Sequence, residues 1–456
     1  MHLGLLISVA TAAMLLPCPP THWDATPPII APSSARPFIR TVVAPDALTI
    51  GDEHAWLASH ADEMLASLQQ CGVVHFRGFA SPKTQEGFRE FCSALPLQPC
   101  FDPLSSIGVR SLMSAADGIY EAVDAESTAD TFIGLHNDAT YKLAAPYAAF
   151  VCFQRAASGG TFLVADGQAI LRSLSPEVRD CLVQRQMRVR VAALPIGGAI
   201  SALPPAVQDP LRPLVASIVR FAIRAALPLD LDVAWDAGGD SLQVLEQPKP
   251  AFNRHPATKA ASFFSGVHSQ SRTLQQRRAG TAFSGVAATD VFWGDGSPIE
   301  GTVLDELDAV ISAHTTPIAM VEGDVVLVDT YSVLHGRETF AGPRQHAVQW
   351  LTEVNGGGGG GDGHGGGGGA SALSGLVNRF AVKRRTRDVQ MAEGTSRVLD
   401  CGFDMANVVA KGHPGGVLRA GQACAPGCCW SASREERSSP RVAARAHGNV
   451  QSTKEL

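Results

Sequence analysis

Residues 323–344, GDVVLVDTYSVLHGRETFAGPR, decide the fold and the site more than any other stretch of this 456-residue chain. Residues 325–328 are apolar at every position, which is typical of a strand that is buried on both faces. His335 and Arg344 follow this strand. The stretch therefore predicts a buried strand that brings a histidine and then an arginine to one site.

Short apolar runs separated by Gly, Ser and Pro continue this pattern from Phe132 onward. They include YAAFVCF at 147–153, TFLVAD at 161–166 and HAVQWLTEV at 346–354. Short apolar runs bounded by these residues are typical of β-strands. We therefore expect a mainly β fold, a double-stranded β-helix (jelly roll) of two antiparallel sheets with flanking α-helices.

Helical signals lie around these strands. Residues 53–70 place apolar side chains at helical spacing and precede a predicted strand at 72–76. Ser81 has the chemistry of an N-cap for a second helix. Residues 175–183 and 214–227 also have the pattern of helices.

The chain divides into one large predicted domain and two appendages. Residues 17–37 are rich in proline and small residues, which disfavour helix and sheet pairing. The sequence GGGGGGDGHGGGGG at 356–369 has almost no side chains to bury and predicts a flexible coil. The predicted divisions are a targeting segment or disordered linker at 1–37, a domain at 38–354 with a helical insert at about 185–250, a Gly-rich linker at 355–369 and a weakly ordered tail at 370–456.

Residues 3–16, LGLLISVATAAMLL, form an uncharged apolar run of the kind found in a signal peptide. The run is short for a membrane-spanning helix, and no Lys or Arg precedes it. We expect a secretory or organellar targeting segment, with a mispredicted start or a disordered tail as alternatives. Without targeting, the protein is expected in the cytoplasm, and no stable membrane span is expected.

Charge and cysteine content narrow the function classes. A formal net charge of −6 and a pI near 6.2 argue against nucleic acid as the main partner. The basic cluster at 383–387 predicts a solvated charge run, with a nucleic-acid patch as the alternative. Cys424, Cys428 and Cys429 lack the companion spacing of a zinc site. Six cysteines that lie in or before the predicted core are expected to be mostly reduced core residues: Cys18, Cys71, Cys92, Cys100, Cys152 and Cys181.

The motif HND, with His136 and Asp138, is the second informative feature. Non-haem iron that activates oxygen is held by two imidazoles and one carboxylate on one face, which leaves positions open. Alternate residues of an extended segment point to the same side, and His335 could complete the set. The motif is weak alone, because residues 22–24 (HWD) and 60–62 (HAD) match it too.

Four segments in register add specificity to this interpretation. They are SGGTFLVADG at 158–167, RHPATKAASFF at 254–264, FWGDGSPI at 292–299 and the opening stretch at 323–344. In this order they resemble the taurine dioxygenase-like (TauD/TfdA) family of Fe(II)/2-oxoglutarate-dependent dioxygenases. The resemblance covers roughly residues 38–354 and implies the same jelly-roll fold.

The resemblance implies roles for individual residues. His136, Asp138 and His335 correspond to the iron ligands, and the carboxylate of Asp138 implies a hydroxylase or desaturase rather than a related halogenase. Thr161 falls where the family places a hydroxyl on the distal carboxylate of 2-oxoglutarate. Arg344 is expected to clamp that carboxylate, since a guanidinium offers a bidentate and permanently charged partner.

One departure from the family concerns the arginine. The family often has two adjacent arginines, whereas Gln345 follows Arg344 here. Strand alternation lets only one of the pair face the pocket, so the clamp is compromised if the second position is the usual anchor. Arg337 is the alternative anchor, and a surface salt bridge is the alternative role of Arg344.

The sequence also predicts environments for four other polar residues. His75 lies between apolar residues and is expected to be a hydrogen-bonded core histidine. His255 has either a structural role or a place at the rim of the substrate site. His346 is a candidate to face the pocket. Asn137 either orients substrate or faces solvent.

The predicted activity couples oxidative decarboxylation of 2-oxoglutarate to hydroxylation or desaturation of a small organic substrate. Fe(II) is the predicted cofactor, and 2-oxoglutarate and O2 are the predicted co-substrates. A 2-oxoglutarate oxygenase that acts on a protein side chain and a non-catalytic jelly-roll binding protein are the alternatives. The substrate depends on loops and on the insert, where no motif is recognisable.

Overall fold

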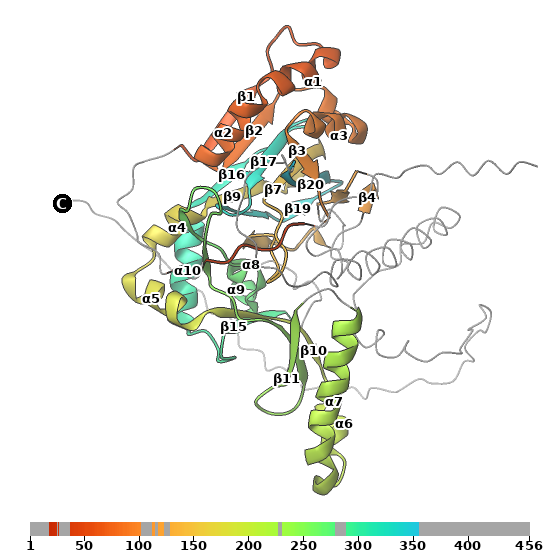
Figure 1. Ribbon diagram of the computed structural model, residues 1–456, viewed down its shortest axis with the longest axis vertical. Coiled ribbons are helices and arrows are strands. Elements are labelled where there is room, and N and C mark those ends of the chain that lie inside the picture. The colour runs from red at the N-terminus through yellow and green to blue at the C-terminus, as the bar shows by residue number, and fades with distance from the viewer. Residues whose placement is uncertain are drawn as a thin grey trace, which may run out of the picture. The chain divides into compact units, whose positions relative to one another are not determined.

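The computed structural model describes residues 18–24, 26, 37–101, 112–114, 117–122, 128–226, 230–278 and 289–354 (Figure 1). The predicted targeting run, the Gly-rich linker and the tail with its basic cluster and three cysteines lie outside the described residues. The predicted targeting and the predicted division of the chain stay predictions. Among the helices of the described part, none is long and apolar enough to cross a membrane.

An eight-stranded sheet forms the first layer. Its strands are β1 Ile39–Val43, β2 Val73–Arg77, β3 Leu97–Pro99, β4 Leu112–Ser114, β5 Ile119–Glu121, β7 Tyr147–Gln154, β17 Val325–Asp329 and β20 Gln345–Glu353. They are ordered β1-β2-β17-β7-β20-β5-β4, and β3 also pairs with β20. The predicted apolar strand is β17, which lies antiparallel between β2 and β7.

A four-stranded sheet forms the second layer. Its strands, in spatial order, are β16 Thr315–Ile318, β9 Phe162–Asp166, β18 Val333–Arg337 and β6 Ile133–His136. Phe150 and Trp350 of the first sheet share one buried apolar cluster with Phe162 of the second. The two sheets therefore pack face to face as a mainly β jelly roll, as predicted, and the described strands do not close into a barrel.

Helices cover the outer faces of both sheets (Figure 1). Those packed on the eight-stranded sheet are α1 Ile50–Ser59, α2 Ala61–Cys71 and α3 Gln85–Ser93. Those packed on the four-stranded sheet are α4 Gly167–Ser173, α5 Pro176–Arg185, α8 Val267–Gln270, α9 Arg272–Arg277 and α10 Gly301–Ala313. The central strands are apolar at consecutive positions because both of their faces are covered.

Two details of the predicted helices were wrong. The single helix predicted at 53–70 is split at His60, whose ring Nδ1 lies 2.8 Å from the carbonyl oxygen of Trp56. Ser81 begins a short 3-10 helix, Ser81–Lys83, and does not cap α3. Thr84 is the cap, because its backbone is extended and its side chain accepts a hydrogen bond from the N–H of Gly87.

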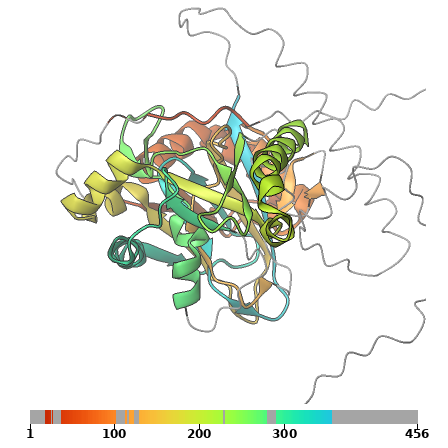
Figure 2. The same cartoon turned by 90° about the horizontal axis from the view of Figure 1, so that it is seen from below.

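The insert predicted to be helical, at about 185–250, also contains three strands. Together with one strand from outside the insert, they form a third sheet. Its strands, in spatial order, are β11 Leu231–Trp235, β12 Leu242–Glu246, β10 Met187–Leu194 and β15 Asp290–Trp293. Helix α7, Pro205–Ala226, follows the short α6, Gly197–Ser201, and buries one face on this sheet (Figure 2). The helix predicted at 214–227 is thus confirmed, although it begins earlier. Two short pairs complete the strands: β13 Phe252–Arg254 with β14 Ala261–Phe263, and β8 Ser158–Gly159 with β19 Phe340–Ala341.

Residues 18–24, which we call the N-terminal strap, lie against this core although they fall in the predicted linker. The N–H of Thr21 donates to the carbonyl of Lys142, and the N–H of Ala144 donates to the carbonyl of Pro19. These bonds are those of a short added strand, and Pro20 forms an isolated antiparallel bridge in the same place. The strap is therefore held by backbone pairing.

Candidate metal centre and co-substrate pocket

His136, Asp138 and His335 meet at the edge of the four-stranded sheet. His136 ends β6 and lies directly opposite His335 of β18. Nε2 of His335 is 2.8 Å from Oδ2 of Asp138, and Nε2 of His136 is 3.6 Å from Oδ1. The potential ligand atoms all lie within 4.8 Å of one another. One metal ion could therefore contact all three side chains.

The surroundings fix the orientation of both imidazoles. Nδ1 of His136 lies 2.8 Å from the carbonyl oxygen of Gly134, which requires the proton on Nδ1 and leaves Nε2 for a metal. The ring of His335 packs against Phe150 and Phe162, with ring centroids 4.8 and 6.2 Å away. The side chain of His136 is 17% exposed, against 4% for His335, so solvent reaches the centre from the His136 side.

His268 on α8 supports the strand that carries His136. Its Nδ1 accepts a hydrogen bond of 2.9 Å from the N–H of Leu135, so its protonated Nε2 faces Asp308 at 3.3 Å. Burial lowers the pKa of His268, which favours this neutral form. Gly134 allows the approach, since a Cβ there would lie 2.5 Å from the carbonyl oxygen of His268. His268 carries no signal in the sequence, because a helix as short as α8 leaves no periodic pattern.

Asn137 turns away from the ligands on either side of it. Its Nδ2 donates to the carbonyl oxygens of Thr330 at 2.8 Å and Val333 at 3.0 Å, and the residue is 9% exposed. It therefore ties the end of β6 to the turn between β17 and β18. The predicted alternative of facing solvent is wrong, because the side chain is buried. Asn137 is not among the described residues that line the cavity described below, since neighbours in an extended segment point to opposite sides.

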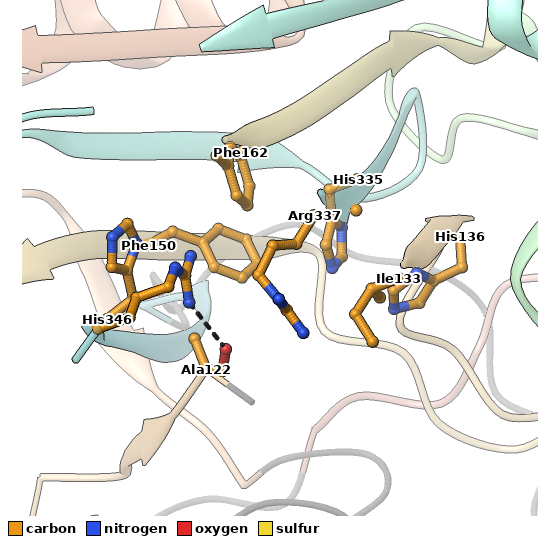
Figure 3. A pocket seen from close by; sticks show the side chains of 10 residues that line it. Ala122, Ile133, His136, Phe150, Phe162, His335, Arg337 and His346 are labelled. Atoms are coloured by element: carbon orange, nitrogen blue, oxygen red, sulfur yellow. Dashed lines mark hydrogen bonds between the residues drawn. The ribbon is translucent and has the colours of Figure 1, made fainter. Parts of the chain in front are cut away.

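A cavity of about 420 Å³, counted with the space open to solvent, begins at His136 and His335. Figure 3 shows these two histidines at one end and His346 at the other. The remaining wall residues are Ala122, Ile133, Phe150, Phe162, Gly336, Arg337 and Arg344. Mostly apolar walls with a few convergent polar groups are typical of small-molecule sites.

Both candidate arginines lie in this cavity. The guanidinium carbons of Arg337 and Arg344 lie 4.6 and 5.7 Å from the ring centroid of Phe340. Nη1 of Arg344 donates to the carbonyl of Ala122 over 3.5 Å, a long hydrogen bond drawn dashed in Figure 3. Arg344 is 8% exposed, so its predicted alternative as a surface residue is wrong. Arg337 donates to backbone carbonyls at three positions, namely Thr128, Thr131 and Glu338.

Alternation at the start of β20 decides which position of the arginine pair faces the cavity. Arg344 and His346 line it, whereas Gln345 between them is exposed. A cation at position 345 would point away, so Gln345 does not remove a charge from the cavity. Gly160 makes room for the arginine, because a Cβ at this left-handed residue would lie 3.2 Å from Cδ of Arg344.

Thr161 is not among the described residues that line the cavity. It is half-buried, and its carbonyl accepts a hydrogen bond of 3.1 Å from the N–H of Glu338. The next residue, Phe162, forms the wall instead. The contact between the Thr161 hydroxyl and 2-oxoglutarate stays a prediction.

His346 faces the cavity, as predicted, and is 4% exposed. Burial, followed by the positive charges of Arg344 and Arg337, holds the pKa of His346 well below its ordinary value. The imidazole is therefore neutral at neutral pH. It adds a hydrogen-bonding group to the far end of the cavity without adding charge.

His75 is a core histidine, as predicted. Its Nε2 lies 2.9 Å from Oδ2 of Asp324, and Nη2 of Arg77 binds the same oxygen at 2.7 Å. Burial raises the pKa of Asp324 and is the largest single effect. The hydrogen bonds, taken together, outweigh it and lower this pKa below its ordinary value. The group joins β2 to the start of β17 and has no place in the cavity wall described above.

The contacts of His255 support a structural role, which was one of its two predicted alternatives. Its Nδ1 accepts hydrogen bonds from the N–H groups of Ala257 and Thr258, both at 3.1 Å. Its Nε2 must then carry the proton, and it lies 3.0 Å from Oδ2 of Asp329. Because Asp329 ends β17, this motif holds the turn that leads to His335.

Comparisons with known proteins complete the description of the site. Residues 34–351 match the family model described as taurine catabolism dioxygenase TauD, TfdA family. The dapdiamide synthesis protein DdaC of Enterobacter agglomerans is 25% identical over 293 residues, which cover 63% of this chain and 84% of DdaC.

Solved structures that resemble this chain share little sequence identity with it. PvcB from Pseudomonas aeruginosa shares 14% identity with a TM-score of 0.40, covering 69% of this chain and 86% of PvcB. An asparagine oxygenase in complex with Fe(II), 3-hydroxyasparagine and succinate also shares 14% identity, with a TM-score of 0.39 and 69% and 93% coverage. Since the family model spans most of the chain, this protein belongs to the TauD/TfdA family of Fe(II)/2-oxoglutarate-dependent dioxygenases.

Proposed function

We propose that His136, Asp138 and His335 hold Fe(II) and that the protein oxidises a small organic substrate at this centre. The observation that carries the proposal is the convergence of two imidazoles and one carboxylate within 4.8 Å. This donor set suits non-haem Fe(II) and leaves positions open for a chelating co-substrate and oxygen. When bound, Fe(II) with 2-oxoglutarate and O2 supplies the oxidative decarboxylation and the oxidation of a substrate C–H bond.

Arg344 is the proposed anchor for the distal carboxylate of 2-oxoglutarate. It lies in the same cavity as the ligand histidines and is almost fully buried, so water screens its charge little. Arg337 also lines the cavity, but three backbone carbonyls already orient its guanidinium. We therefore assign Arg337 to the wall of the pocket and Arg344 to the co-substrate.

The cavity supports a small substrate rather than a protein side chain. Its wall combines apolar side chains such as Phe150 and Phe162 with a few convergent polar groups, which is the lining typical of small-molecule pockets. Phe150 and Phe162 exclude water from the inner side of His335, which strengthens the electrostatic interactions there. His136 is the more exposed ligand histidine, so the substrate approaches from its side.

The test is succinate formation from 2-oxoglutarate by the purified protein under air with added Fe(II). Wild type should form succinate only when Fe(II) is present, and His335→Ala should abolish this turnover. His75→Ala is the matched control, because it removes another buried, carboxylate-bound histidine. Unchanged turnover by His335→Ala would rule the triad out. A mass gain of one oxygen on a peptide, without turnover of small molecules, would favour a protein substrate.

A further inference from the structure

We propose that Cys18 and Cys100 form a disulfide that staples the N-terminal strap to the eight-stranded sheet. Their Sγ atoms lie 2.7 Å apart, although the residues are 82 positions apart in the chain. Both are buried, at 3% and 0% exposure. A disulfide requires about 2.05 Å between the sulfurs, so the remaining approach is less than about 1 Å.

The two cysteines are held by different parts of the fold. Cys100 follows β3, and its N–H donates to the carbonyl of Trp350 in β20 at 2.9 Å, so its position is set by the main sheet. Cys18 begins the strap, and its thiol donates to the carbonyl of Phe101. A covalent bond between them would therefore tie a short, separately held segment to the core of the fold.

The strap in turn holds the loop that follows the metal-ligand motif. Its backbone pairs with Lys142 and Ala144, and the Thr21 hydroxyl donates to the carbonyl of Thr140 at 3.0 Å. That loop directly follows Asp138, two residues after the end of β6 at His136. The staple thus restrains, through the strap, the segment that presents the carboxylate ligand.

The strap also contacts two other segments that support the site. The N–H of His22 donates to the hydroxyl of Tyr331, in the turn before β18, at 3.1 Å. Asn253 donates to the carbonyl of His22 at 2.6 Å and accepts from the N–H of Asp24 at 3.1 Å. Loss of the strap would therefore release the loop after Asp138 and uncover the turn before His335.

The chemistry is a thiol–disulfide exchange with a small disulfide such as oxidised glutathione. The thiolate of one cysteine attacks this disulfide, and a mixed disulfide and one glutathione thiol form. The second cysteine then displaces the second glutathione. Cys18 and Cys100 lose two hydrogens in total, and the small disulfide is reduced to two thiols.

The first test uses the folded, full-length protein with Fe(II), kept without oxygen and incubated with excess oxidised glutathione. Free thiols are then alkylated, and the protein is digested and analysed by mass spectrometry without reductant. We expect one cross-linked pair of peptides containing Cys18 and Cys100, about 2 Da lighter than their sum. Recovery of both cysteines as alkylated thiols, or each as a glutathione adduct, would overturn the proposal.

The second test asks whether the bond acts as a staple. Oxidation of the wild type should slow hydrogen exchange at the amides of Thr21 and Ala144 by about tenfold or more and raise the melting temperature by roughly 5 °C. Cys18→Ser and Cys100→Ser should lose both responses, and Cys181→Ser should keep them. A cross-linked wild type with neither response, or an equal response in Cys18→Ser, would contradict the proposal.

Discussion

Two buried histidine–carboxylate groups in this chain differ in what surrounds the carboxylate. Asp329 accepts hydrogen bonds from the N–H of Tyr331 and the hydroxyl of Ser332, at 3.0 and 2.7 Å, and faces His255. Asp138 faces two imidazole nitrogens, from ligand histidines that both line the cavity. The first group joins a turn to a loop, and the second gathers metal-binding atoms at a cavity.

The difference teaches how to separate a structural cluster from a metal centre. Both groups contain a histidine close to a carboxylate, so the distance between these two side chains does not distinguish a structural cluster from a metal centre. At Asp329 the donors come from the local backbone and a local hydroxyl, which is how a turn is stabilised. At Asp138 two imidazoles from different strands meet one carboxylate, and a cation between them would offset the cost of burying that charge.

Asp138→Ala should disrupt the metal centre without changing the fold. We expect succinate formation to fall by more than the roughly 10–100-fold that loss of an outer partner of a metal ligand costs. Circular dichroism should show an unchanged fold, since Asp138 faces the two ligand imidazoles. A variant that keeps most of its turnover would show that the carboxylate is not a ligand.

Arg344→Ala should raise the KM for 2-oxoglutarate by about tenfold or more. The lost hydrogen bond to a charged group is worth about 1.5–3 kcal/mol. Arg337→Ala is the matched control, and it should lower the melting temperature more than it changes this KM. If Arg337→Ala raises the KM and Arg344→Ala does not, the assignment of the two arginines is reversed.

His255→Ala should cost stability and leave the chemistry in place. Losing its hydrogen bond to the buried Asp329 should lower the free energy of unfolding by about 2–3 kcal/mol. Urea denaturation measures this change, while iron affinity of the folded variant should match the wild type. An unchanged unfolding midpoint, or an iron affinity reduced as in Asp138→Ala, would remove the distinction drawn between the two groups.

His346 should make the protein less stable as the pH falls below about 6.5. Unfolded His346 titrates near its ordinary pKa of about 6.5, whereas its pKa in the fold is well below that value. Between the two pKa values only the unfolded chain binds the proton, so the free energy of unfolding decreases as pH decreases. His346→Gln should reduce this slope, measured by urea denaturation between pH 7 and 5. An equal pH dependence of the unfolding free energy in both proteins would contradict its assignment to His346. His268 contributes in the same direction and stays in both proteins.

Gln345→Arg should have the smallest effect. The added arginine restores the pair common in the family, but position 345 is exposed and faces away from the cavity. We expect the KM for 2-oxoglutarate to change by less than about twofold, measured as succinate formation. A large decrease would mean that the second position of the pair is the anchor.

The fold and the ligand set were predictable from the sequence because strong local patterns carried them. The apolar runs at 325–328 and 147–153 predicted two neighbouring strands of the eight-stranded sheet, β17 and β7. The ligands His136 and His335 followed from motifs in register with a family. Arg344 was placed in the pocket on the same basis, and strand alternation then explained Gln345.

The remaining features depend on contacts that a linear pattern does not contain. The partners of Asn137 could not be predicted, because they are backbone carbonyls of a turn far along the chain. His268 acts through one backbone N–H of another segment. The N-terminal strap has a proline-rich composition that suggests a linker, and only its pairing with Lys142 and Ala144 shows that it is packed.

The most direct test of the central claim is anaerobic titration of the apoprotein with Fe(II). Wild type should bind one Fe(II) per chain, and His136→Ala, Asp138→Ala and His335→Ala should each weaken binding by more than about 100-fold. His255→Ala should bind as the wild type does. Stoichiometric binding with wild-type affinity in all three triad variants would contradict the account.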